Sequence, residues 1–207
     1  MCGIVGGTSE RNILPILVEG LRRLEYRGYD SAGVAFKQNG TIGVVKNAGR
    51  VEQLAKKIKL KENSANLGIA HTRWATHGVP SEKNAHPHSS KDIFVVHNGI
   101  VENHEDLKAE LRSEGIRFSS QTDTEVIAHL VQYYVEKGQS FEKAVFNTVK
   151  KLKGAYALGI LNKKEPEQLI GVRNQSPLVL GKGFQENFIG SDVMALAPVT
   201  NKFVYLE

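Results

Sequence analysis

The sequence has only one cysteine, Cys2, among its 207 residues. An intrachain disulfide is therefore excluded, and so is a zinc site built from several cysteine thiolates. A single thiol is typical of a reducing compartment, so we expect a cytoplasmic protein. No run approaches the ~20 apolar residues of a membrane-spanning helix. No basic segment followed by an apolar one marks a signal peptide, so we expect no membrane partner.

The chain also lacks a strong excess of charge of one sign. Its formal net charge is +5, and the densest basic run is residues 56–61. A solvated helix face explains that run, because nucleic-acid binders usually add a recognisable module or an aromatic platform. The hydrophobic content of 41% and the charged content of 24% are ordinary for a globular protein. We therefore expect one domain over residues 1–207 and no nucleic-acid partner.

Apolar periodicity and turn residues predict an α+β domain. Strands come first, then helices, then strands again, which favours layered sheets over a regular βαβ chain. Asn39-Gly40 between two strand patterns predicts a hairpin turn. The sequence ends inside an expected strand, so we expect an N-terminal domain cut from a longer protein. The strands are expected at 3–7, 31–36, 42–46, 67–71, 93–97, 155–161, 168–172, 177–180, 188–190 and 203–206, and the helices at 14–24, from about 102, after 122, and at 141–152.

Two further features are the start of the third predicted helix and a long polar segment earlier in the chain. Residues 122–125 read Thr-Asp-Thr-Glu, which predicts a capping box at the start of the helix. Residues 72–92 form a long polar segment, and loops of that length are usually functional or disordered.

Cys2 is the first candidate for chemistry. Removal of Met1 would leave Cys2 with a free α-amine, whose reference pKa of about 7.7–8.0 suits a general base. A terminal amine beside a side-chain nucleophile is an established way of activating it. By its position and residue type alone, however, Cys2 fits better as a small apolar residue that opens a buried strand.

Asn98 and Gly99 stand where an apolar strand pattern ends. The Asn98 side chain and the Gly99 backbone could each offer an N–H group, and two such donors aimed at one point make an oxyanion hole. A plain Asn-Gly turn explains the pair as well.

Arg73 and Asp123 could bind a charged substrate. A guanidinium suits a carboxylate, and a carboxylate suits an ammonium group. A surface salt bridge for Arg73 and a helix-dipole role for Asp123 are the alternatives. Together with Cys2, the two residues fit a free amino acid with a side-chain amide, such as glutamine. His71, His77, His86 and His88 match no standard ligand spacing, so we expect no metal.

Several motifs occur together in one order. They are MCGIVG at 1–6, LRRLEYRGYDSAG at 21–33, HTRWATHG at 71–78, NAHPH at 84–88, HNGI at 97–100 and TDTEVIAHL at 122–130, and SPL at 176–178 and GSD at 190–192 extend the set. The set resembles the glutaminase domains of glucosamine-6-phosphate synthases, which are N-terminal-nucleophile glutamine amidotransferases. The resemblance covers essentially the whole chain.

The resemblance implies a four-layer αββα sandwich and no cofactor. It implies that Cys2 is the nucleophile, that its α-amine is the base, and that Asn98 and Gly99 form the oxyanion hole. It further implies that Trp74 belongs to a loop that closes over glutamine and gates ammonia, and that Arg27 orders the nucleophile end. The residues it implies for holding L-glutamine are Arg73, Thr76, His77, Gly99 and Asp123.

The resemblance also implies partners outside this chain. A C-terminal isomerase domain would use the ammonia to convert fructose 6-phosphate into glucosamine 6-phosphate, and the full-length enzyme would be a homo-oligomer. Two other interpretations stay open. The chain could serve another amidotransferase, such as amidophosphoribosyltransferase, or it could be a glutamine sensor with an inert Cys2.

Overall fold

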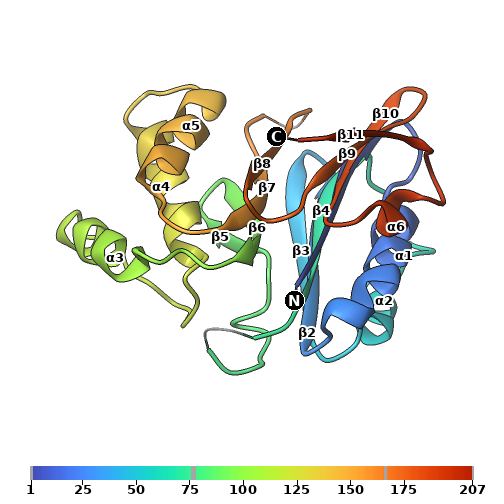
Figure 1. Ribbon diagram of the computed structural model, residues 1–207, viewed down its shortest axis with the longest axis horizontal. Coiled ribbons are helices and arrows are strands. Elements are labelled where there is room, and N and C mark those ends of the chain that lie inside the picture. The colour runs from blue at the N-terminus through green and yellow to red at the C-terminus, as the bar shows by residue number, and fades with distance from the viewer. Residues whose placement is uncertain (1, 76–77, 166, 207) are drawn as a thin grey trace.

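The computed structural model describes residues 2–75, 78–165 and 167–206. Two antiparallel sheets are stacked face to face, and helices cover the outer face of each sheet (Figure 1). The layers therefore run helix, sheet, sheet, helix, which confirms the predicted α+β fold and its αββα order.

The larger sheet has seven strands in the order β11-β9-β10-β1-β4-β2-β3. Strand β1 pairs with β4 in an antiparallel register that sets Gly3 opposite Thr72. The start of β1, next to Cys2, therefore meets the end of β4, next to Trp74. The strands are β1 (Gly3–Ser9), β2 (Ser31–Gln38), β3 (Thr41–Ala48), β4 (Leu67–Arg73), β9 (Val179–Lys182), β10 (Glu186–Gly190) and β11 (Lys202–Tyr205).

The smaller sheet has four strands in the order β5-β6-β7-β8. Strands β6 and β7 lie against β1 and β4 of the larger sheet. Fully buried Ile4 and Ile69 from one sheet and Val96 from the other belong to the apolar cluster between them. The strands are β5 (His88–Ser90), β6 (Ile93–Gly99), β7 (Tyr156–Asn162) and β8 (Leu169–Asn174).

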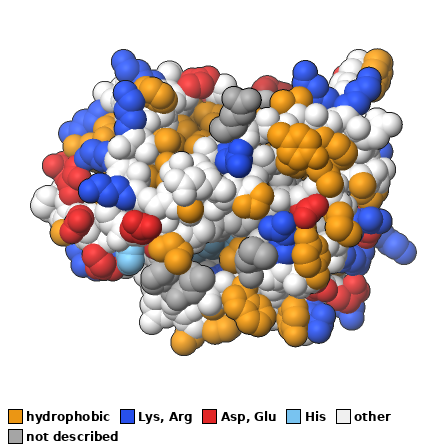
Figure 2. Space-filling view, in the orientation of Figure 1, with side chains coloured by type: hydrophobic (Ala, Val, Ile, Leu, Met, Phe, Trp, Pro, Cys, Tyr) orange, Lys and Arg blue, Asp and Glu red, His pale blue; other side chains and the backbone are white. Residues whose placement is uncertain are grey.

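Two groups of helices close the outer faces. Helices α1 (Leu14–Leu24), α2 (Val51–Ile58) and α6 (Val193–Leu196) lie beside the larger sheet, and α3 (His104–Ser113), α4 (Glu125–Glu136) and α5 (Phe141–Lys151) lie beside the smaller one (Figure 1). Each group packs its apolar face into a separate buried cluster. None of the helices in the described ranges is long and apolar enough to cross a membrane. On the face drawn in Figure 2, basic and acidic side chains are interspersed.

Most predicted elements are confirmed. The helix over 14–24 has the predicted bounds, and Asn39 and Gly40 make the hairpin turn with φ angles of 50° and 74°. Sequence analysis missed β5, α6 and a short 3-10 helix, Glu25–Arg27, and it indicated α2 only through the basic run at 56–61. The missed elements are too short to show a period, and β5 orders part of the long polar segment expected to be a loop.

The predicted capping box at Thr122 is wrong. Helix α4 begins at Glu125, and no side-chain hydrogen bond caps its first turn. The buried Glu125 carboxylate instead accepts hydrogen bonds from the backbone N–H groups of Ser119 and Ser120, at 2.8 and 2.6 Å. The loop before α4 folds back over the first turn of the helix, and the Glu125 carboxylate holds it there.

Candidate functional site

Cys2 lies at the start of β1, against the end of β4. Its Sγ accepts a hydrogen bond from the Trp74 backbone N–H at 3.3 Å and lies 3.5 Å from the Trp74 carbonyl oxygen. Burial raises the pKa of the Cys2 thiol, and the Trp74 N–H opposes this effect only in part. The thiol is therefore protonated near neutral pH, and a nucleophilic role requires a base beside it.

The Asn98 side chain lies next to Cys2, although it comes from the other sheet. Its Nδ2 donates to the Cys2 carbonyl oxygen at 3.2 Å and to Ser191 Oγ at 2.8 Å, while its Oδ1 lies 3.0 Å from His71 Nε2. Ser191 Oγ also accepts from the Ile4 N–H at 2.8 Å. The Ser191 hydroxyl therefore ties the nucleophile strand to the Asn98 amide. If Asn98 stabilises a substrate oxyanion, the Nδ2 hydrogen that now points to the Cys2 carbonyl oxygen must also point to that oxyanion.

Gly99 ends β6 in a backbone conformation that needs glycine. Its φ is +115°, and an added Cβ would lie 2.0 Å from the Ala155 carbonyl oxygen. The backbone of Gly99 is exposed to a pocket of ≈ 290 Å³. This pocket brings together Cys2, Arg27, Trp74, Asn98, Gly99, Ile100, Ser176 and Pro177.

Arg73 is buried at the end of β4. Its Nη2 donates to the Gly78 carbonyl oxygen at 3.0 Å, and its Nη1 lies 3.9 Å from Asp30 Oδ1. Asp30 Oδ2 also accepts a hydrogen bond from the Ala75 backbone N–H. Asp30 therefore supports the segment that carries Arg73.

Asp123 is buried on the opposite wall. Its Oδ2 accepts from the Val101 N–H at 2.9 Å, and its Oδ1 lies 3.9 Å from His97 Nδ1. A narrow space of ≈ 10 Å³ separates Asp123 from Arg73 and Cys2. That volume is about the room of one water molecule.

Two predicted residues, Trp74 and Arg27, lie at the edge of the site. Trp74 is 54% exposed, and its ring meets the Tyr29 ring edge-on with the two centroids 6.4 Å apart. Arg27 forms an ion pair with Asp192 at 3.1 Å. Asp192 directly follows Ser191, which gives Arg27 an indirect path to the nucleophile end. Thr76 and His77 lie outside the described residues.

Three histidines and a threonine form a buried chain behind Asn98. His71 Nε2 lies 2.9 Å from the His97 carbonyl oxygen, so this nitrogen carries the hydrogen. His86 Nδ1 accepts from the His97 N–H at 3.4 Å, and His86 Nε2 lies 3.1 Å from Thr124 Oγ1. Thr124 Oγ1 lies 2.9 Å from His97 Nδ1. These contacts fit neutral imidazoles that orient one another.

The metal interpretation of the histidines finds no support among the described residues. No three His, Cys, Asp or Glu side chains in the described ranges come together as a set that could hold a metal ion. His71 Nε2 and His86 Nδ1 lie 3.2 Å apart and face each other. His77, the fourth histidine of that interpretation, lies outside the described residues.

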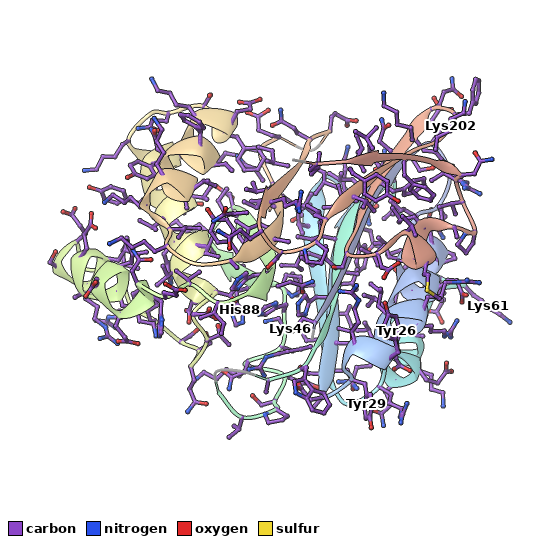
Figure 3. The ribbon with its side chains drawn as sticks, viewed as in Figure 1. Tyr26, Tyr29, Lys46, Lys61, His88 and Lys202 are labelled. Atoms are coloured by element: carbon purple, nitrogen blue, oxygen red, sulfur yellow. The ribbon has the colours of Figure 1, made fainter. Side chains whose placement is uncertain are left out.

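We expect the free energy of unfolding to fall between pH 7 and pH 5. Burial lowers the pKa of His71 and of His88 from 6.5 to about 3, and the nearby Lys46 charge contributes at His88 (Figure 3). Below pH 6.5 these two histidines take up protons in the unfolded chain but stay neutral in the folded chain. The free energy of unfolding that they contribute above pH 6.5 is therefore lost as the pH falls toward 3. The loss at pH 5 is about 2 kcal/mol for each of the two histidines. Urea unfolding at pH 7, 6 and 5 measures it.

The matched variant for this prediction is His88→Gln. A glutamine amide can keep the 3.1 Å contact to Thr122 Oγ1 but does not titrate. We expect the variant to show a shallower pH dependence than the parent. An unfolding midpoint that stays constant from pH 7 to pH 5 in the parent protein would contradict the burial of neutral histidines.

Sequence reasoning missed the supporting residues Ser191, His71 and Thr124. Only the GSD motif at 190–192 pointed to Ser191, and nothing in its spacing predicted a bond to Asn98. The structure does bring Cys2, Arg73, Asn98, Gly99 and Asp123 together. The assigned roles of these five residues stay predictions.

Comparisons with known proteins identify the family of this domain. The model of the glutamine amidotransferase domain family matches residues 71–198. Glutamine–fructose-6-phosphate aminotransferase (isomerizing) of Acinetobacter baylyi is 57% identical over 207 residues, which is all of this chain and 34% of that protein. The enzyme of the same name from Escherichia coli K12 is 52% identical over 208 residues, again 34% of its length.

A solved structure shares the fold. Glutamine phosphoribosylpyrophosphate amidotransferase from B. subtilis superposes with a TM-score of 0.84 at 26% identity, over 99% of this chain and 44% of that one. The αββα sandwich is therefore that of the N-terminal-nucleophile amidotransferases. The chain belongs to the glutamine amidotransferase domain family, and along its whole length it is homologous to about a third of glutamine–fructose-6-phosphate aminotransferase.

Proposed function

We propose that this chain hydrolyses L-glutamine to glutamate and ammonia through a γ-glutamyl thioester on Cys2. The observation that supports this most directly is the meeting of Cys2, Asn98 and Gly99 at the junction of the two sheets. Arg73 and Asp123 lie on opposite walls of the adjoining space. One wall thus offers a cation for the α-carboxylate and the other an anion for the α-ammonium.

The proposed reaction begins after Met1 has been removed. The free α-amine of Cys2 takes the proton from Sγ, and the thiolate attacks the side-chain amide carbon of glutamine. Asn98 Nδ2 and the Gly99 N–H stabilise the oxyanion. The terminal ammonium returns its proton to the leaving nitrogen, and the C–N bond breaks to release ammonia. Water then attacks the thioester carbon, which releases glutamate and restores the thiol.

The remaining site residues take supporting roles in the proposal. Thr76 and His77 help Arg73 to hold the amino-acid head group. Trp74 closes over glutamine and gates ammonia. Arg27 orders the nucleophile end through its 3.1 Å ion pair with Asp192, the residue that follows Ser191.

The whole protein is proposed to be longer than this domain. The chain spans 34% of the length of the curated relatives it matches. Residues 1–207 would form one glutaminase domain, and a C-terminal isomerase domain would pass its ammonia to fructose 6-phosphate in a homo-oligomeric, cytoplasmic enzyme. The identity of 57% to that enzyme, against 26% to the phosphoribosylpyrophosphate amidotransferase, favours this acceptor.

One experiment tests the central proposal. Intact mass and glutamate release are measured on the same sample, which is then treated with 6-diazo-5-oxo-L-norleucine, an electrophile shaped like glutamine. We expect Met1 to be absent, glutamate to appear, and one adduct to map to Cys2. A sample without Met1 that binds glutamine but shows neither turnover nor adduct would indicate the sensor instead.

A further inference from the structure

Asn84 joins the two walls of the head-group site. Its side chain is buried, with 2% exposed, between the segment after Arg73 and the segment before Asp123. Asn84 Nδ2 donates to the Val79 carbonyl oxygen and to Gln121 Oε1, both at 3.0 Å. Asn84 Oδ1 accepts from the Gln121 backbone N–H at 3.1 Å. Asn84 and Gln121 therefore donate one hydrogen bond to each other, and we call this pair of hydrogen bonds the bridge.

The bridge continues to Arg73 on one side. The Arg73 guanidinium donates to the Gly78 carbonyl oxygen at 3.0 Å, and Val79 follows directly. Gly78 packs tightly at this point, because an added Cβ would lie 2.7 Å from Asn84 Nδ2 and 2.9 Å from Gln121 Cβ. The position of Arg73 is thus coupled to Asn84 through two consecutive residues.

On the other side the bridge reaches Asp123 within two residues. Glu125 fixes the start of this segment by accepting hydrogen bonds from the N–H and hydroxyl groups of Ser119 and Ser120. Gln121 follows directly, and its two bonds to Asn84 set where the chain runs on to Asp123. The segment is therefore held at one end by Glu125 and across the site by Asn84.

We propose that Asn84 and Gln121 are positioning residues that set the distance between Arg73 and Asp123. The inference rests on the proposed function, since it treats these two walls as the binders of the α-carboxylate and α-ammonium of glutamine. Neither Asn84 nor Gln121 lines the space between Cys2, Arg73 and Asp123, so neither touches the reacting atoms.

The chemistry at Cys2 depends on other contacts. Cys2 is held by the Trp74 backbone and Asn98 is held by Ser191 and His71. Loss of the bridge should therefore weaken binding of the amino-acid head group while leaving attack on the amide carbon almost intact. The expected signature is a higher KM at nearly constant kcat.

The test compares Gln121→Met with Gln121→Glu. Methionine has a similar length but no strong acceptor for Asn84 Nδ2, whereas a glutamate oxygen can accept that hydrogen bond. Gln121 is exposed, so neither change disturbs the core. We expect Gln121→Met to raise the KM for glutamine about fivefold, the range for one lost hydrogen bond, with kcat within about twofold of the parent. Gln121→Glu should recover most of the loss.

A double-mutant cycle locates the effect in the bridge. If Asn84 and Gln121 act together, Asn84→Ala combined with Gln121→Met should raise KM by less than the product of the two single effects. Alkylation of Cys2 by iodoacetamide, which lacks the amino-acid head group, should keep its parent rate in every variant. Urea unfolding identifies any variant that has lost its fold.

Two outcomes separate the inference from the function on which it rests. A parent protein that turns over glutamine, with variants whose KM is unchanged or whose kcat alone falls, overturns the bridge and leaves the function standing. A parent protein that lacks Met1 and shows no turnover overturns the function. Calorimetric binding of L-glutamate, which carries the same head group, then still tests the bridge, because Gln121→Met should weaken that binding about fivefold.

Discussion

Replacing Cys2 with serine is expected to lower kcat for glutamine hydrolysis by at least about 10³-fold. A serine hydroxyl is far less acidic than a thiol, so an amine with a pKa of about 7.7–8.0 can hardly deprotonate it. The change removes one sulfur from a partly exposed position, and the Trp74 N–H that now donates to Sγ can donate to Oγ instead. Glutamate release, followed by a coupled dehydrogenase assay, measures the loss.

The control for Cys2→Ser is a measurement of its thermal stability, which shows that the variant is folded. We expect Cys2→Ser to keep the parent unfolding temperature to within a few degrees. Because Cys2 is the only cysteine, thiol labelling of the parent reports on this residue alone. A folded Cys2→Ser protein that keeps a tenth or more of the parent activity would exclude Cys2 as the nucleophile.

Replacing Asn98 with alanine is expected to lower kcat by about 10²–10³-fold, with a much smaller change in KM. The Asn98 amide lies beside Cys2 and is oriented on both sides, by Ser191 Oγ at 2.8 Å and His71 Nε2 at 3.0 Å. A donor held in this way costs no reorganisation when charge develops on the substrate oxygen. The loss should therefore appear in kcat, measured with saturating glutamine.

Asn162→Ala is the matched control for Asn98→Ala. Asn162 is equally buried in the smaller sheet, and it caps a turn by accepting from the Lys164 N–H at 3.0 Å, remote from Cys2. Its loss should lower the unfolding temperature and leave kcat unchanged. Ser191→Ala keeps the Asn98 amide but removes one of its hydrogen-bond partners, so its kcat should lie between those of Asn98→Ala and Asn162→Ala. Equal kcat values for Asn98→Ala and Asn162→Ala would exclude the oxyanion role.

Local patterns predicted the framework well, because burial repeats along each element. The stripe of Leu14, Leu17 and Leu21 gave helix α1 its bounds, and Asn39-Gly40 gave the hairpin between β2 and β3. Glu125 was misread because its partners, Ser119 and Ser120, precede the helix. A capping motif and a loop anchor use the same residue types, and only the folded loop distinguishes them.

The site was predictable in its chemical groups and unpredictable in its supports. Cys2, Asn98 and Gly99 were candidates because a nucleophile and paired donors belong to few residue types, and the resemblance carried by the ordered motifs singled them out. Ser191 was not, because its bond to Asn98 spans 93 residues of sequence. Contacts of that range follow from how the two sheets stack, which no local pattern encodes.

The stacking of the sheets has a consequence for measurement. Cys2 belongs to one sheet and Asn98 to the other, and the dry layer formed by residues such as Ile4, Ile69 and Val96 sets their spacing. The value of kcat then depends on the spacing between the two sheets. A truncation such as Ile69→Val, which removes no polar group of the site, should slow turnover before spectroscopy detects any loss of secondary structure.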